Sequence, residues 1–157
     1  FTMWHEYFPF GKIFTMDISS ERKEEWGEIF LGDQNSLSDL ERVKEKIEKC
    51  DVIVDDGSHV PEHQIKSFVY LFQQVLKPGG IYIIEDVECS FWNPQSEVYG
   101  YKVGKHNILN FFSSSPYEIN SPKPPSTRVA GRASVSAHAP PLSPFTTFRM
   151  TSRKRRT

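Results

Sequence analysis

The sequence predicts an α/β fold in which a parallel sheet is flanked by helices. Short continuous runs of β-branched and other apolar residues, which are typical of strands buried on both faces, alternate with longer segments of helical periodicity. Strands that alternate with helices in this way favour parallel pairing through right-handed crossovers. The first part of the chain is therefore expected to form one layered α/β domain.

The first 33 residues contain a short helix and two candidate strands. Apolar residues between Met3 and Phe8 have helical spacing, and Pro9-Phe10-Gly11 is expected to end that helix. Residues 12–17 then form a short buried strand that finishes on Asp17. Residues 28–31 are a weaker strand candidate, closed by Gly32-Asp33.

A capping-box pattern predicts the next helix. Ser38 is followed three residues later by Glu41, which is the spacing at which a serine and a glutamate cap the first turn of a helix. Four apolar side chains recur at helical spacing and are expected to face inward: Leu37, Leu40, Val43 and Ile47.

A second strand–helix–strand unit follows. Residues 51–56 form a β-branched run that predicts a buried strand, and Pro61 suits the first turn of the helix after it. The apolar stripe of this helix is expected to contain Ile65, Phe68, Val69, Phe72 and Leu76. The segment 77–80, Lys-Pro-Gly-Gly, is expected to stop the helix, and residues 81–84 are expected to form another buried strand that ends at Glu85-Asp86.

Charge and composition divide the chain into two parts. Residues 1–112 carry 11 basic and 19 acidic side chains, whereas residues 113–157 carry 8 basic side chains, one acidic side chain and 7 of the 11 prolines. The second part has too few large apolar residues to offset its conformational entropy. We therefore expect a partial α/β domain over 1–112 and a disordered Ser/Pro/Arg-rich basic tail over 113–157.

Acidic residues stand at the end of every predicted strand. Asp17, Asp33, Asp56 and Asp86 would all reach the same edge of a parallel sheet, where ligands of such sheets bind. Carboxylates brought together in this way can share a hard cation such as Mg²⁺. Left unpaired they would repel one another, so the alternative is a basic residue, not identifiable from the sequence, that neutralises them.

Two motif blocks resemble a known family. They are Asp55-Asp56-Gly57-Ser58-His59 and Ile84-Glu85-Asp86, with Lys-Pro-Gly-Gly between them. Over residues 1–112 the chain is similar to class I S-adenosylmethionine-dependent methyltransferases, and in particular to metal-dependent O-methyltransferases that act on macrolide sugars and to related domains found beside polysaccharide genes. The resemblance implies a Rossmann-like sheet and a transferase that methylates a hydroxyl group, such as that of a sugar.

The resemblance also implies roles for individual residues. Asp17 matches the acid that holds the cofactor ribose, and Asp33 and Gln34 match the segment that reaches the adenine; Asp55 is counted with these cofactor-binding residues. The implied ligands of Mg²⁺, or of a similar divalent cation, are Asp56, Glu85 and Asp86. His59 matches the general base, and a neutral imidazole suits the removal of a proton from a metal-polarised hydroxyl.

One segment of the family pattern is missing. Such domains begin with a strand and a glycine-rich turn, but no G-x-G sequence occurs in this chain. The missing strand would lie at the centre of the sheet, between the strands that end at Asp17 and Asp56. We therefore expect either a vacancy or a non-standard pairing there, and we expect these residues alone to be inactive.

Several other interpretations remain open. His59, Glu62 and His63 fit the H-x-x-E-H signature of inverted zinc proteases, but Pro61 places His59 before the helix, so the two rings need not converge. Residues 153–156, Arg-Lys-Arg-Arg, are either a nucleic-acid contact, a nuclear address or a solvated end. A non-catalytic α/β remnant is the alternative to an enzyme.

The remaining expectations concern the compartment and the pocket. Cys50 and Cys89 are expected to be free thiols, and the chain shows neither a membrane span nor a signal peptide, so we expect a soluble cytoplasmic protein. Four aromatic side chains follow the last acidic strand end and are expected either to wall a substrate pocket or to have an ordinary packing role: Phe91, Trp92, Tyr99 and Tyr101.

Overall fold

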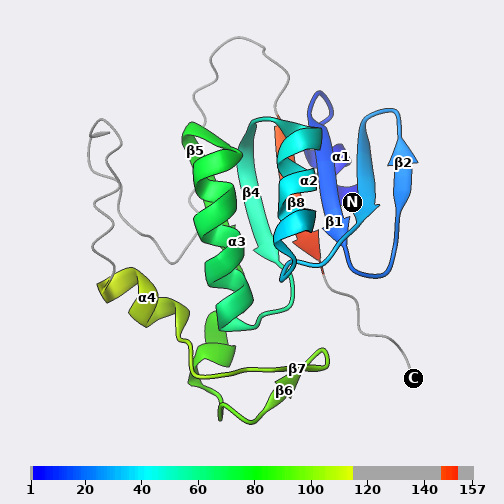
Figure 1. The fold of residues 1–157 in the computed structure, drawn as a ribbon. Helices are drawn as coiled ribbons and strands as arrows, with labels where there is room; N and C mark the ends of the chain where they lie inside the picture. Colours follow the sequence, from blue (N-terminus) through cyan, green and yellow to red (C-terminus); the bar gives the residue numbers. More distant parts are fainter. Residues whose placement is uncertain (1, 115–145, 152–157) are drawn as a thin grey trace.

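The computed structural model describes residues 2–114 and 146–151, and Figure 1 shows their arrangement. Six strands form one sheet, in which every neighbouring pair is parallel except the outermost, β2 with β3. In spatial order the strands are β2 (Arg22–Glu24), β3 (Gly27–Leu31), β1 (Lys12–Asp17), β8 (Thr146–Thr151), β4 (Cys50–Asp56) and β5 (Leu76–Ile84). The predicted α/β class with a mainly parallel sheet is confirmed.

Helices cover the sheet unequally. In Figure 1, α2 (Leu37–Ile47) and α3 (Pro61–Gln74) lie side by side in front of the sheet, and the short α1 (Thr2–Tyr7) lies behind it. Helix α4 (Ile108–Ser114) packs beside α3. The 3₁₀ turn η1 (Val87–Phe91) and the hairpin of β6 (Glu97–Val98) and β7 (Tyr101–Lys102) lie below the carboxyl ends of the parallel strands.

Strand β8 fills the centre of the sheet. It lies between β1 and β4 and is parallel to both, with Phe148 opposite Phe14 on one side and Ile53 on the other. Phe148 and Met150 are 0% and 1% exposed, because alternate side chains of β8 point into the core under α2 and α3. The position expected for the missing strand is thus occupied by a non-standard pairing.

This finding corrects the expectation of a disordered tail for residues 146–151. Apolar side chains alternate along these six residues, and their backbone is paired on both edges, so the strand is buried. Composition averaged over 113–157 does not reveal so short a strand. Ser113 and Ser114 belong to α4. Residues 115–145 and 152–157, including the basic stretch 153–156, lie outside the described residues.

The start of α2 differs from the prediction. The cap is Ser36, whose hydroxyl accepts a hydrogen bond from the backbone N–H of Asp39, and the helix begins at Leu37 rather than after Ser38. Leu40, Val43 and Ile47 are buried as expected, but Leu37 is 53% exposed because it lies in the first helical turn, beyond the sheet-facing stripe.

The buried face of α3 is more polar than predicted. Gln64 and Ser67 are fully buried together with Leu71, whereas Phe68 and Phe72 are half-buried and pack on each other. Phe68 also contacts Tyr82 and α4. Leu76 lies in β5, not in α3, and so do residues 77–80, the expected helix stop.

Strand β5 is not the buried strand that the sequence predicts. Ile81 and Ile83 are 58% and 41% exposed, because β5 is an edge strand and no described helix covers its outer face. The prediction that Cys50 and Cys89 are free thiols is confirmed, and the structure shows both to be buried. No helix among residues 2–114 and 146–151 is long and apolar enough to span a membrane.

Candidate functional site

A cavity of about 770 Å³ opens between the carboxyl ends of the parallel strands and the β6–β7 hairpin. The segments that follow β1, β3 and β4 form its walls, and β8 and the hairpin complete them. Its lining residues are Met16, Ile18, Ser19, Gly32, Asp33, Gln34, Gly57, Ser58, Tyr99, Gly100, Tyr101, Met150 and Thr151. The volume is within the range that small-molecule sites usually have.

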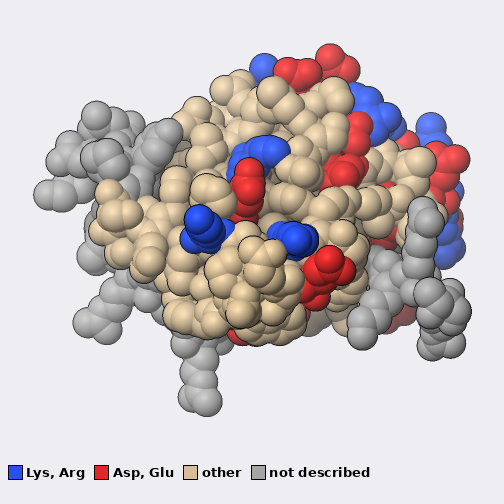
Figure 2. All heavy atoms as spheres, turned by 60° about the horizontal axis from the view of Figure 1, so that its bottom comes forward, with Lys and Arg blue, Asp and Glu red and all other residues tan. Residues whose placement is uncertain are grey.

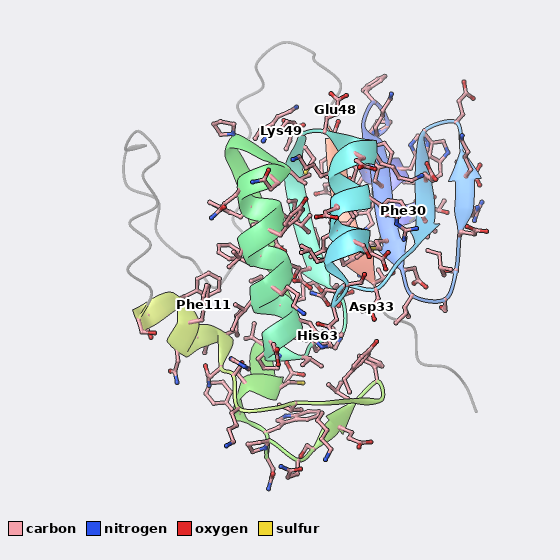
Figure 3. All side chains as sticks on the ribbon, in the orientation of Figure 1. Phe30, Asp33, Glu48, Lys49, His63 and Phe111 are labelled. Atoms are coloured by element: carbon pink, nitrogen blue, oxygen red, sulfur yellow. The ribbon has the colours of Figure 1, made fainter. Side chains whose placement is uncertain are left out.

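Asp33 connects the cavity wall to the β6–β7 hairpin. Its carboxylate accepts a hydrogen bond from the Tyr101 hydroxyl at 3.0 Å and another from the backbone N–H of Asn35. Figure 3 shows Asp33 and His63 at the end of the sheet where the hairpin lies, whereas Glu48 and Lys49 lie at the opposite end. Of the four aromatic residues expected near a pocket, Tyr99 and Tyr101 line the cavity; Phe91 and Trp92 are 70% and 44% exposed.

Gln34 and Asp55 belong to a buried hydrogen-bond network. The Gln34 amide donates to both Asp55 oxygens at 2.7 and 2.8 Å, and its carbonyl oxygen accepts from the Ser58 backbone N–H. Ser67 donates to the same carboxylate. Burial raises the pKa of Asp55 to about 6 despite these hydrogen bonds. The network joins β4, α3 and the segment after β3, and it therefore shapes the cavity wall.

Asp17, the residue expected to hold a ribose, is buried at the carboxyl end of β1. Burial alone would raise its pKa, but hydrogen bonds from Thr151, Ser19 and Ser20 lower it. The Thr151 hydroxyl reaches it at 2.7 Å, and the backbone and hydroxyl of Ser19 each reach it at 2.8 Å. Both carboxylate oxygens thus already accept hydrogen bonds, one of them from β8.

Beside the cavity, Asp56, His59 and Asp86 form a cluster that we call the acidic cluster. One potential ligand atom from each residue lies within 4.8 Å of the other two. His59 is 7% exposed, its Nε2 lies 3.8 Å from Asp86 Oδ2, and its ring is 5.3 Å from that of Tyr99 at the cavity wall. His59 and Asp86 have φ angles of 58° and 51°, a left-handed conformation that is uncommon for non-glycine residues and is concentrated at functional sites.

Arg149 of β8 lies against the acidic cluster. Its guanidinium donates a hydrogen bond to Asp56 Oδ2, and its Cζ lies 5.9 Å from the ring centroid of Trp4. This is the neutralising basic residue that could not be identified from the sequence. The available signal was the alternation in residues 146–151, which places Phe148 and Met150 on one face of a strand and Arg149 on the other.

Glu85 has a different position from the other predicted metal ligands. It is not in the group of three that the structure brings together within the described residues. Burial, followed by the neighbouring charge of Asp56, raises the pKa of Glu85. Its backbone N–H donates to the carbonyl oxygen of Asp55, which keeps the turn after β5 close to the end of β4.

His63 takes no part in the acidic cluster. Its Nδ1 lies 2.8 Å from the Ser58 hydroxyl, and burial lowers its pKa. His59 precedes α3 while His63 lies in its first turn, and among the described residues the two histidines share no metal-type group. The zinc-protease interpretation is therefore not supported. On the face that Figure 2 shows, acidic and basic side chains are interspersed and form no patch of one sign.

The chemistry of these residues fits the ligands implied by the sequence. Two carboxylates and an imidazole within 4.8 Å can hold a divalent cation, although one of the carboxylates already pairs with Arg149. The cavity beside them has the size of a cofactor site. At Gly57 an added Cβ would lie 2.2 Å from the side-chain oxygen of Gln34, so only glycine allows this close approach at the cavity wall.

Comparison with curated proteins reveals relatives of one kind. The chain is 38% identical over 92 residues to mycinamicin VI 2''-O-methyltransferase of Micromonospora griseorubida, which corresponds to 57% of this chain and 23% of the relative. It is 38% identical to demethylmacrocin O-methyltransferase of Streptomyces fradiae and 35% identical to a tetracenomycin 2'-O-methyltransferase of Streptomyces olivaceus, over the same length. The chain thus spans about a quarter of these relatives. No family model matches.

Solved structures give the same result. A crystal form of the methyltransferase MycE from the mycinamycin pathway, in complex with Mg and SAH, matches with a TM-score of 0.58 and 34% identity, over 71% of this chain and 29% of that one. A complex that also contains mycinamycin VI matches with a TM-score of 0.53 and 38% identity, over 57% and 25% of the two chains. These matches confirm the Rossmann-like character of the sheet.

Proposed function

We propose a function on the premise that this chain is a partial homologue of the macrolide-sugar O-methyltransferases. In this proposal the cavity binds S-adenosylmethionine, and the acidic cluster is the metal and proton-transfer part of an O-methyltransferase site. The observation that carries the proposal is the position of the acidic cluster. It lies directly beside a cavity at the carboxyl ends of parallel strands, and Tyr99, which lines the cavity, is in ring contact with His59 of the cluster.

The residues of the chain have separate roles in this proposal. Asp33 and the hairpin residue Tyr101 would hold the cofactor in the cavity, with Asp17, Gln34 and Asp55 supporting the wall. Asp56 and Asp86 would hold the divalent cation, and Glu85 would add negative charge beside them. When bound, the cation polarises the acceptor hydroxyl and the cofactor supplies the methyl group.

His59 is the proposed general base. Its Nε2 lies 3.8 Å from Asp86 Oδ2, and its ring is 5.3 Å from that of Tyr99, which lines the cavity. When a hydroxyl acceptor takes the methyl group from the cofactor sulfur, the His59 imidazole would accept the hydroxyl proton. The relatives' names point to a sugar hydroxyl as the acceptor class. The chain spans about a quarter of these relatives, so the part of the proposal that its described residues carry most directly is cofactor binding.

Calorimetric titration with S-adenosylhomocysteine (SAH), without metal, tests the cofactor part of the proposal. We expect the full chain to bind SAH and Asp33→Ala to weaken binding by about tenfold or more, because a hydrogen bond to a charged group contributes about 1.5–3 kcal/mol. Glu41→Ala, on the exposed face of α2 away from the cavity, is the matched control and should bind like the wild type. A wild-type chain that binds no SAH, or equal binding by Asp33→Ala, would contradict the proposal.

A further inference from the structure

We infer that Arg149 is the built-in counter-ion of the acidic cluster, so that a divalent cation enters only when the guanidinium leaves Asp56. The inference rests on the metal site of the proposed function and adds a regulating residue to it. It predicts that the wild-type chain keeps this site closed to divalent metal and that neutralising one side chain opens it.

The first argument is how firmly the guanidinium is held. Arg149 Nη2 donates to Asp56 Oδ2, and the side chains of the two residues are only 24% and 22% exposed. The ring of Trp4 in α1 also faces the guanidinium, at a distance suited to a cation–π contact. A pair that is largely shielded from water is screened much less than one on the surface.

The second argument is competition for one carboxylate. Asp56 supplies one of the three ligand atoms that lie within 4.8 Å of one another. A divalent cation needs that oxygen at bonding distance, and a guanidinium hydrogen-bonded to the same carboxylate would repel the cation. Asp86 and His59 remain, but two ligands are a weaker site for a hard cation than three.

The third argument is that β8 cannot easily withdraw. The two residues next to Arg149 in this strand, Phe148 and Met150, are buried in the core, and Thr151 is hydrogen-bonded to Asp17. The backbone of β8 is paired along both edges. Because the strand is anchored, only the Arg149 side chain itself can move away from Asp56, and the charge at this one position decides whether the cluster accepts a metal.

Titration of the full chain with Mn²⁺ alone, followed by calorimetry and by the electron paramagnetic resonance signal of free Mn²⁺, tests the inference. Arg149→Met retains the apolar stem and removes the charge, and we expect it to bind Mn²⁺ at least tenfold more tightly than the wild type. Arg22→Met removes an exposed arginine that pairs with Glu24 outside the site, and it should bind Mn²⁺ like the wild type. Equal or weaker binding by Arg149→Met would overturn the inference.

A double variant shows whether the gain passes through the proposed carboxylate. Arg149→Met combined with Asp56→Asn should return to the weak binding of the wild type, and a gain that survives in this variant also overturns the inference. If circular dichroism shows that Arg149→Met is unfolded, Arg149→Gln, which can still donate a hydrogen bond to Asp56, carries the same expectation. A wild type that binds Mn²⁺ as tightly as Arg149→Gln would decide against it.

These titrations contain no cofactor, so the two proposals can fail separately. If Arg149→Met gains Mn²⁺ binding but the chain never binds SAH, the inference about Arg149 stands and the proposed cofactor site does not. If the chain binds SAH but Arg149→Met gains no Mn²⁺ binding, the proposed cofactor site stands and the inference about Arg149 does not.

Discussion

At the end of β4 two neighbouring aspartates have opposite environments, because successive side chains of a strand point to opposite faces of the sheet. Asp55 is fully buried on the α3 side, where Gln34 and Ser67 donate hydrogen bonds to it. Asp56 points toward the face where Arg149 and α1 lie. The first residue thus holds the fold together at the site, and the second is available for chemistry or for neutralisation.

His63 is expected to make the free energy of unfolding depend on pH. Burial lowers its pKa below 6.5, so the folded chain binds fewer protons than the unfolded chain once the pH falls through 6.5. The free energy of unfolding should therefore decrease as the pH falls from 6.5 toward the lowered pKa. Urea denaturation between pH 7 and pH 5 should show a smaller decrease for His63→Asn than for the wild type.

The control for this prediction is a variant without a titratable change. Ile53→Val, in the fully buried core, should lower the free energy of unfolding by about 0.5–1.5 kcal/mol at every pH and leave its pH dependence unaltered. If His63→Asn kept the full wild-type decrease, His63 would not be its source.

At the scale of elements, β8 is the feature that most changes the interpretation of the chain. Side chains of opposite character alternate along it, so one strand supplies Phe148 and Met150 to the core and Arg149 to the acidic cluster. Thr151, at its end, lines the cavity and donates a hydrogen bond to Asp17. A single short strand therefore links core packing to the charge of the site.

Phe148→Ala tests the position of β8. Phe148 is 0% exposed and stacks on Phe30 with ring centroids 6.2 Å apart, so its truncation should lower the free energy of unfolding by about 3–5 kcal/mol. Phe91→Ala, at a residue that is 70% exposed, should change it by less than about 0.5 kcal/mol. Urea denaturation measures both variants, and a loss below about 1 kcal/mol for Phe148→Ala would show that β8 does not occupy the core.

At the scale of the whole molecule, the sheet has two halves that meet at β8. Strands β2, β3 and β1 form one half, and β4 and β5 form the other; in the described part of the chain no other strand pairs with both β1 and β4. The cavity also draws its walls from both halves. The integrity of the fold and the shape of the candidate site thus depend on the same strand.

Truncation makes this dependence measurable. A chain that ends at Ser114 should lose the single cooperative unfolding transition and bind a hydrophobic dye, because β1 and β4 would both lose their shared partner and expose core residues such as Met16 and Ile53. A chain that ends at Thr151 should retain the transition. Circular dichroism during thermal and urea unfolding compares the two chains, and an unchanged midpoint after truncation at Ser114 would contradict the central role of β8.

Local patterns in the sequence were sufficient for most elements and for the acidic residues at the strand ends. Strand runs, helix periodicity and turn residues are properties of neighbouring positions, so β1, β4 and α3 could be predicted, and Asp56 and Asp86 with them. The exact cap of α2 and the exposure of β5 could not be predicted, because they depend on which serine reaches the helix N-terminus and on which strand lies at the edge.

The sequence by itself thus determined an α/β domain that resembles sugar O-methyltransferases and places carboxylates at one edge of its sheet. Only the tertiary structure decided that residues 146–151 complete the centre of that sheet and that Arg149 neutralises Asp56, 93 positions away in the chain. The physical reason is that pairing between distant strands and contact between distant charges leave no periodic signal. They are set by the burial and backbone hydrogen bonding of the whole fold.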